Sequence, residues 1–161
     1  GLRYDLLLYD GQNGPAYLEE IIDHHISGQL KVAPEHTVEH ILNLMKKPAG
    51  WQLIDFKNIF DQLNRKCRKK QFLTYYFIAA HPGCREHDME ILRSFVHRAL
   101  KIHPEQVQIF TPLPLTYSSV MYYTEKDPFT GKGIFVEKSM AGKERQKRCL
   151  TGEGGSHRRR D

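Results

Sequence analysis

Three short apolar runs constrain this chain most, because each stops at a polar residue or a proline and is followed by a helix-like pattern. The runs cover residues 30–36, 75–83 and 107–112. A repeating order of strand, polar tip and helix is typical of parallel βα proteins. Since these proteins place ligand chemistry at the carboxyl ends of their strands, the three tips are where functional residues are expected.

A fourth strand is predicted ahead of the other three. The apolar run 2–8 predicts this first strand, and further strands are predicted at 30–33, 72–80 and 107–110. Apolar residues at helical spacing predict helices over 17–26, 38–45, 53–63 and 89–100. We expect Pro15 and Thr37 to start two of these helices and Gly28 to end one. A short helix at 118–123, a β-like run at 134–136 and a charged helix at 143–150 complete the predicted order.

The predicted fold class is α/β, with parallel strands alternating with helices. Four such strands are too few to close a barrel, so we expect an open sheet or part of a barrel whose other strands are missing. With 161 residues, 40% of them hydrophobic, the chain suffices for one domain, predicted over 1–150. The Gly- and Arg-rich residues 151–161 predict a disordered basic tail. Because the chain opens inside a predicted strand and without Met, we expect a piece of a longer protein.

The net charge of +5 is concentrated in two places, residues 65–70 and 158–160. A basic helix end complements the negative pole of a helix dipole, which we prefer to a phosphate-binding patch. Charge gathered at a helix end and a terminus argues only weakly for nucleic acid. One of the two hypotheses for this chain is nevertheless a non-catalytic α/β binding module with a basic tail, with RNA as its candidate ligand.

The three cysteines, Cys67, Cys84 and Cys149, are odd in number and far apart. They suggest no disulfide framework, so a cytoplasmic location is expected. No apolar run reaches the length of about 18 residues that a membrane span needs, and no signal-peptide pattern opens the chain. We therefore expect no membrane partner.

Several residues at the tips are candidates for chemistry. Glu35 is placed either to accept hydrogen bonds from ligand hydroxyls or simply to stabilise the following helix through its dipole. His81, Cys84 and His87 resemble zinc ligands, but a turn into a helix would spread them and no fourth ligand is apparent, so no metal is predicted. Gly83 is suited to a tight turn and a close backbone approach to a ligand. Ser118 and Ser119 are better read as helix-start residues than as nucleophiles.

Taken in order, the tips resemble the radical S-adenosylmethionine (SAM) superfamily, and most closely its uncharacterised YgiQ-like branch. The segments that carry the resemblance are 27–36, 76–83, 106–114 and 121–124. The likeness covers roughly residues 1–150. It implies a partial TIM-type (βα)6 barrel in which this chain supplies the third to sixth strands.

The resemblance also implies a SAM site. Similar enzymes hold the ribose with a Gln or Glu at the fourth-strand tip, which corresponds to Glu35. They hold the methionyl carboxylate with a basic residue in the next helix, which corresponds to Lys47 with Lys46 adjacent. On the third strand Arg3, or less well Asp5, would face the ligand. The family's fifth-strand pattern corresponds to Tyr76, Ile78, Ala80, Gly83 and Glu86, with two glycines replaced, and Ile109 and Phe110 would flank adenine.

The three-cysteine motif that holds the family's four-iron four-sulfur (4Fe-4S) cluster is absent from this chain. A cluster requires closely placed thiolates, which Cys67, Cys84 and Cys149 do not provide. The resemblance therefore implies that SAM and the 4Fe-4S cluster are cofactors of a longer parent enzyme of unknown substrate. The fragment itself is expected to be catalytically inert and to bind no cofactor. Its expected partners are the missing amino-terminal half of the barrel or, through an exposed first strand, another copy of itself.

Overall fold

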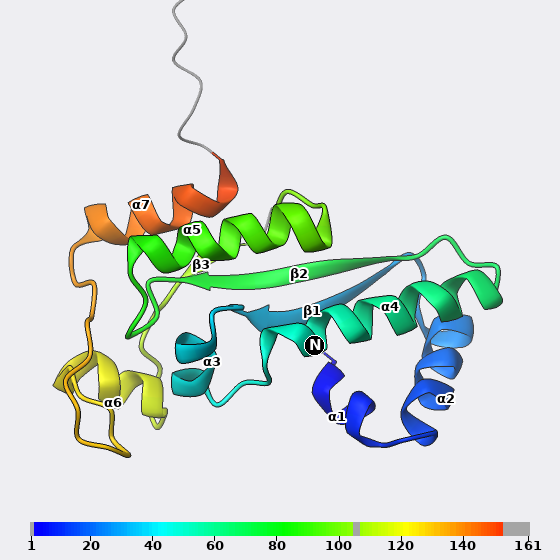
Figure 1. The fold of residues 1–161 in the computed structure, drawn as a ribbon, viewed down its shortest axis with the longest axis horizontal. Helices are drawn as coiled ribbons and strands as arrows, with labels where there is room; N and C mark the ends of the chain where they lie inside the picture. Colours follow the sequence, from blue (N-terminus) through cyan, green and yellow to red (C-terminus); the bar gives the residue numbers. More distant parts are fainter. Residues whose placement is uncertain (1, 105–106, 153–161) are drawn as a thin grey trace, which may run out of the picture.

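The computed structural model describes residues 2–104 and 107–152, and the strands in these ranges form one parallel sheet. Its order is β1 (Gln29–Glu35), β2 (Phe72–Ala79) and β3 (Val107–Ile109). Helices alternate with these strands, and in the described part of the chain the sheet stays open (Figure 1). The predicted α/β class is therefore confirmed, with three strands in place of four.

The helices form two layers around the sheet. On one face lie α5 (Glu86–Phe95), which continues as a π-helical turn over Val96–Leu100, and α7 (Met140–Thr151). On the other face lie α1 (Tyr4–Tyr9), α2 (Asn13–Glu20) with its π-helical turn Ile21–His25, and α4 (Gly50–Lys66). Two short helices, α3 (Glu39–Met45) and α6 (Tyr117–Thr124), lie near the carboxyl ends of the strands (Figure 1).

The core lies between the sheet and these helices. On β2 the side chains of Tyr75, Phe77 and Ala79 are buried, which is the period-two pattern of a strand. The predicted stripe of α5 and its extension is also buried, as one face of a helix requires: Met89, Leu92, Val96 and Leu100. The periodicity thus located the core side of this helix correctly.

The predicted first strand is wrong, because residues 4–9 form helix α1. Only Leu2 keeps the expected position, in an isolated parallel bridge with Val32 of β1. The run is rich in Leu and holds no β-branched residue, so it has no strong preference for a strand. As a helix it packs Tyr4 against Phe56 of α4, with ring centroids 5.7 Å apart.

Other local predictions are also corrected. Residues 134–136 form no strand, although the Phe135 carbonyl accepts a hydrogen bond from the Gly83 N–H at 2.7 Å. Gly28 does not end a helix in the left-handed conformation, since the preceding π-helical turn stops at His25. Thr37 caps nothing: α3 starts after Val38, whose N–H donates to His36 Nδ1 at 3.0 Å.

Two further predictions concern the ends and the surroundings of the fold. Most of the predicted tail, residues 153–161, lies outside the described residues. Among the residues that the structure describes, no helix is long and apolar enough to cross a membrane.

Candidate functional site

A cleft of about 310 Å³ opens where the three strands end, and its lining mixes apolar and polar side chains. Each strand contributes to it near its carboxyl end: Glu35 from β1, Ile78 from β2 and Ile109 from β3. The remaining lining residues come from α3, the strands, the β2–α5 turn, the segment between β3 and α6, and the first turn of α6: Met45, Tyr76, His81, Gln108, Phe110, Thr111, Leu113, Thr116 and Ser118. The carboxyl edge of the sheet therefore carries the site, as the βα order predicts.

The Glu35 carboxylate forms the charged end of the cleft. Its backbone adopts φ +64°, a left-handed conformation unusual for a residue other than glycine or asparagine. Because α3 begins only at Glu39, this turn places Glu35 outside the helix, where it forms an ion pair with Lys47 (Oε1 to Nζ 2.9 Å). Both side chains are about three-quarters buried. A carboxylate and a cation held together at a strand tip can receive hydroxyls on one side and an anion on the other.

Lys46 and Lys47 point to different partners. Lys46 ends α3 in a left-handed conformation, and its ammonium lies 4.2 Å from the centre of the Phe129 ring. Lys47 alone of the two is paired with Glu35. The geometry therefore favours Lys47 over Lys46 for a role at the cleft.

His81 lies at the floor of the cleft, at the end of β2, and is 2% exposed. Its Nδ1 is 2.8 Å from the Pro82 carbonyl and its Nε2 is 2.8 Å from the Ser118 hydroxyl. Its ring meets the Phe110 ring edge to face, with centroids 5.2 Å apart. Burial lowers the pKa of His81 to about 4, against an opposing effect of the Pro82 carbonyl, so the ring is neutral near pH 7.

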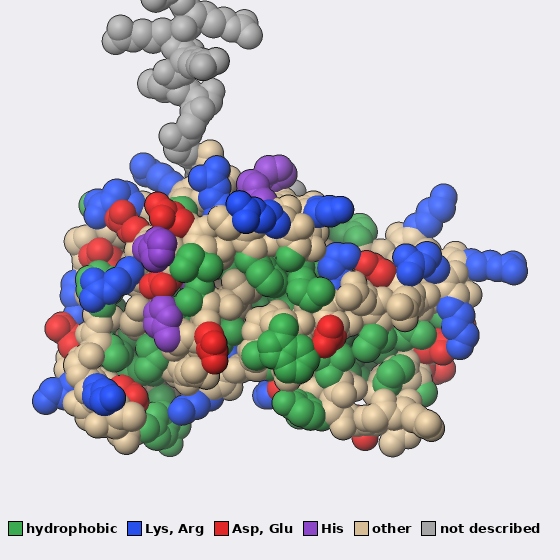
Figure 2. Space-filling model, in the orientation of Figure 1, with side chains coloured by type: hydrophobic (Ala, Val, Ile, Leu, Met, Phe, Trp, Pro, Cys, Tyr) green, Lys and Arg blue, Asp and Glu red, His purple; other side chains and the backbone are tan. Residues whose placement is uncertain are grey.

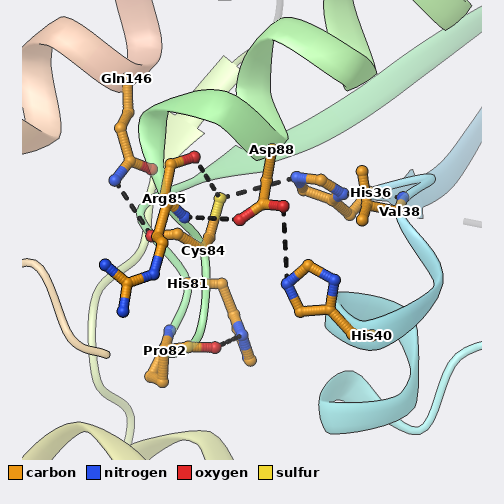
Figure 3. Close-up of polar contacts among 9 residues, drawn as sticks. All are labelled: His36, Val38, His40, His81, Pro82, Cys84, Arg85, Asp88 and Gln146. Atoms are coloured by element: carbon orange, nitrogen blue, oxygen red, sulfur yellow. Dashed lines mark hydrogen bonds and ion pairs between the residues drawn. The ribbon is translucent and has the colours of Figure 1, made fainter. Parts of the chain in front are cut away.

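A side chain of α7 holds the turn that carries His81. The buried side chain of Gln146 accepts a hydrogen bond from the Ala80 N–H at 2.9 Å. It also donates one to the Cys84 carbonyl at 3.1 Å, which Figure 3 shows. Ala80 and Gly83 both have positive φ, at +59° and +92°. A residue distant in sequence thus fixes a turn in which Ala80 adopts a backbone conformation unusual for a residue other than glycine.

A second polar cluster lies behind the cleft, between α3 and the start of α5. His36 Nε2 is 3.6 Å from Cys84 Sγ, and His40 Nε2 is 3.5 Å from the Asp88 carboxylate, which also accepts the Arg85 N–H (Figure 3). Burial lowers the pKa of His36 to about 3, helped by the nearby His81 and His40, and raises the pKa of the Cys84 thiol to about 12. This thiol is therefore protonated and poorly nucleophilic near pH 7.

Four of the seven residues predicted to bind the cofactor line the cleft: Glu35, Ile78, Ile109 and Phe110. Lys47 reaches it through its ion pair with Glu35. Gly83 supplies a tight turn, but it lies against Leu44 and Ile41 and does not line the cleft. Arg3 pairs with Asp5 (Nε to Oδ1 2.8 Å) and is also not among the lining residues.

Sequence reasoning missed several polar members of the site. Tyr76 of β2 donates a hydrogen bond to Gln108 of β3, and burial, followed by the Glu35 charge, raises the pKa of Tyr76. The sequence pattern indicates His81 only as a candidate metal ligand and Ser118 only as a helix-start residue. Strand alternation places Tyr76 and Ile78 on one side of the sheet, so the pattern held the signal for Tyr76. The contact between His81 and Ser118 joins segments 37 residues apart, and no local pattern encodes it.

A 4Fe-4S cluster does not fit the residues that the structure describes. No group of three or more His, Cys, Asp or Glu side chains in these ranges is arranged to hold a metal ion, and the three cysteines are free thiols. The basic segment 65–70 has partners within the fold, since Lys66 pairs with Glu19 at 2.7 Å and Lys69 with Asp23 at 2.9 Å. These pairs favour the structural interpretation of this segment over a phosphate-binding patch.

Comparison with known proteins gives consistent relatives for almost the whole chain. It is 56% identical over 151 residues to a UPF0313 protein of Fusobacterium nucleatum, which is 94% of this chain and 27% of that protein. It is 42% identical over 149 residues to a UPF0313 protein of Bacteroides thetaiotaomicron, which is 89% of this chain and 24% of the relative. This chain is similar to one segment of the UPF0313 proteins. No protein-family model matches it.

The likeness to UPF0313 proteins extends to archaea. The chain is 44% identical over 150 residues to the UPF0313 protein of Methanosarcina acetivorans, which is 93% of this chain and 20% of that protein. The chain spans about a quarter of the length of the curated relatives it matches. The names of these UPF0313 relatives state no activity.

Proposed function

We propose that this chain is the SAM-facing half of a radical SAM iron-sulfur enzyme. The observation that carries the proposal is the convergence of Glu35, Ile78, Ile109 and Phe110 on one cleft at the strand tips. The family resemblance assigns the same four residues to the SAM site. They come from three strands and lie up to 75 residues apart, so their meeting in one cleft is not a consequence of sequence proximity.

The chemistry of the cleft suits an adenosyl ligand. The Glu35 carboxylate can accept hydrogen bonds from both ribose hydroxyls, and hydrogen bonds to a charged acceptor are stronger than neutral ones. Ile78, Ile109 and Phe110 offer apolar surface to a flat base. Lys47, held next to Glu35, supplies a cation for the methionyl carboxylate. When bound, SAM would supply the 5′-deoxyadenosyl group that a reduced cluster releases as a radical.

In this proposal the rest of the parent protein supplies the iron-sulfur cluster that this chain lacks. The cluster cysteines would lie in that remainder, which accounts for about three-quarters of the length of the curated relatives. The face over α1 and the start of α4 shows a gathering of exposed hydrophobic side chains, among them Tyr9 at 75% and Trp51 at 63% exposure (Figure 2). Large apolar groups in such a patch mark a surface that another segment or chain covers.

Turnover by the full-length parent tests the proposal. After anaerobic reconstitution with iron and sulfide and reduction with dithionite, the parent should cleave SAM to 5′-deoxyadenosine and methionine. This chain alone, treated in the same way, should hold no stoichiometric cluster and release neither product. A parent that is loaded with iron and reduced but leaves SAM intact would contradict the proposal, and so would a stable cluster of about four irons on this chain alone.

A further inference from the structure

The His81–Ser118 pair at the floor of the cleft fixes the direction of one hydrogen bond. A carbonyl oxygen can only accept, so the contact between His81 Nδ1 and the Pro82 oxygen at 2.8 Å requires the proton on Nδ1 (Figure 3). In a neutral imidazole the other nitrogen then carries a lone pair. His81 Nε2 therefore accepts the hydrogen bond of the Ser118 hydroxyl at 2.8 Å.

This direction decides what Ser118 offers to the cleft. A hydroxyl has one hydrogen to donate and two lone pairs. Because the hydrogen is directed to His81, Ser118 presents only acceptor capacity to a ligand. His81 cannot easily turn, since it is 2% exposed, bonded to Pro82 and packed edge to face on Phe110.

The neighbouring serine has a different role and provides a contrast. The Ser119 hydroxyl donates to the Leu113 carbonyl and lies 2.8 Å from the Thr116 hydroxyl, and Thr116 in turn caps α6 through the Ser119 N–H. Ser119 is 8% exposed and does not line the cleft, whereas Ser118 does. Helix capping thus accounts for Ser119 and leaves the position of Ser118 unexplained.

The place of Ser118 within the cleft indicates which part of a ligand it meets. Glu35 ends β1, and His81 and Phe110 follow β2 and β3. Adjacent strands lie about 4.8 Å apart, so the tips of β1 and β3 are separated by roughly 10 Å, which is about the length of a nucleoside. With the ribose on Glu35, the base lies beside Phe110 and the His81–Ser118 pair.

We propose that Ser118, oriented by His81, reads the base of the bound nucleoside by accepting a hydrogen bond from an exocyclic purine amine. The inference rests on the proposed function of the cleft as an adenosyl site. It makes Ser118 a specificity-determining residue that selects an amino purine over an oxo purine. An oxo group in the same place would bring two acceptors together and leave both unsatisfied. His81 acts as a positioning residue through Ser118.

Two matched nucleosides test this reading in the full-length parent: methylthioadenosine, which carries the amine, and methylthioinosine, which carries the oxo group. The wild-type protein should bind the adenosine probe roughly tenfold or more tightly than the inosine probe. Ser118→Ala should remove most of this preference, because it weakens the adenosine probe and relieves the acceptor–acceptor clash with the inosine probe. Ser118→Thr, which keeps the hydroxyl, should retain the preference, and so should the control Ser119→Ala.

The outcomes separate this inference from the proposed function. A parent that binds SAM and retains its full preference in Ser118→Ala overturns the reading of Ser118 and leaves the SAM site standing. A parent that binds neither SAM nor the two probes overturns both. Because a merely structural role would weaken both probes equally, equal weakening in Ser118→Ala also overturns the reading.

The orientation of the pair has its own readout, which does not need a ligand. Nitrogen NMR of the histidines in this chain should show His81 protonated at Nδ1, with Nε2 as a hydrogen-bond acceptor, at pH 7. In Ser118→Ala the Nε2 resonance should move toward that of a free acceptor nitrogen, while His36 stays unchanged. A proton on Nε2 in the wild-type chain would overturn the assigned direction.

Discussion

Gln146 is predicted to hold the turn of the candidate site, and Gln146→Met tests this directly. Methionine keeps the length and unbranched shape of the side chain but removes both hydrogen bonds. The Ala80 N–H and the Cys84 carbonyl, which Gln146 satisfies at 2.9 and 3.1 Å, would then lie buried without this partner. An orphaned buried polar group costs about 1–3 kcal/mol, and methionine recovers part of this by burying an apolar chain. We expect the free energy of unfolding to fall by about 2–4 kcal/mol.

Urea denaturation of this chain, followed by far-UV circular dichroism, measures that loss. Arg145→Ala is the matched control on the same helix, because Arg145 and its partner Glu86 are both more than half exposed. It should leave the urea midpoint close to that of the wild type. If Gln146→Met unfolds at the wild-type midpoint with an unchanged slope, the two hydrogen bonds do not hold the turn and the reasoning is refuted.

Three further predictions concern stability and association. Gly83→Ala should lower the free energy of unfolding by about 1–2 kcal/mol in urea titrations, because φ +92° disfavours any side chain and the new Cβ would meet Leu44 Cδ1 at 2.4 Å. The control Gly28→Ala has open space around its new Cβ and should leave the free energy of unfolding nearly unchanged. As the pH is lowered from 6.5 to 4, His36 and His81 take up protons in the unfolded chain but stay neutral in the buried, folded state, so the free energy of unfolding should decrease. For His81 the loss is on the order of 3 kcal/mol. A His81→Gln variant whose stability falls equally steeply as the pH is lowered would contradict this. Light scattering should show self-association that Trp51→Glu reduces, since Trp51 and Tyr9 are largely exposed on the α1–α4 face; a monomeric wild-type chain would argue against it.

The sequence predicted the parallel strands and most helices well because periodicity is a local signal. The apolar run 72–80, closed by His81-Pro82-Gly83, and the stripe Met89, Leu92, Val96 and Leu100 identify a strand and a helix without any tertiary knowledge. The run 2–8 failed because a short apolar stretch has no period that separates strand from helix. Its packing on Phe56 decided the outcome.

The residues of the candidate site also fall into two groups, those that the sequence predicts and those that depend on contacts between distant segments. Glu35, Ile78, Ile109 and Phe110 line the cleft, and strand tips are recognisable in a sequence; their roles toward SAM come from the family resemblance and stay predictions. Gln146 and the pairing of His81 with Ser118 were not found, because they depend on contacts between segments distant along the chain. Arg3 was placed at the cleft on the assumption of a first strand, and with α1 in its place Arg3 pairs with Asp5 instead.

Calorimetric titration of SAM into the reconstituted full-length parent, wild type against Glu35→Ala, tests the central claim most directly. Losing a charge-assisted hydrogen-bond partner costs about 1.5–3 kcal/mol, so Glu35→Ala should weaken SAM binding roughly ten- to hundredfold while the iron content stays the same. Glu39→Ala, which removes an exposed carboxylate from the neighbouring helix, should bind SAM like the wild type. Wild-type affinity in a folded, iron-loaded Glu35→Ala protein would contradict the account of this cleft as the SAM site.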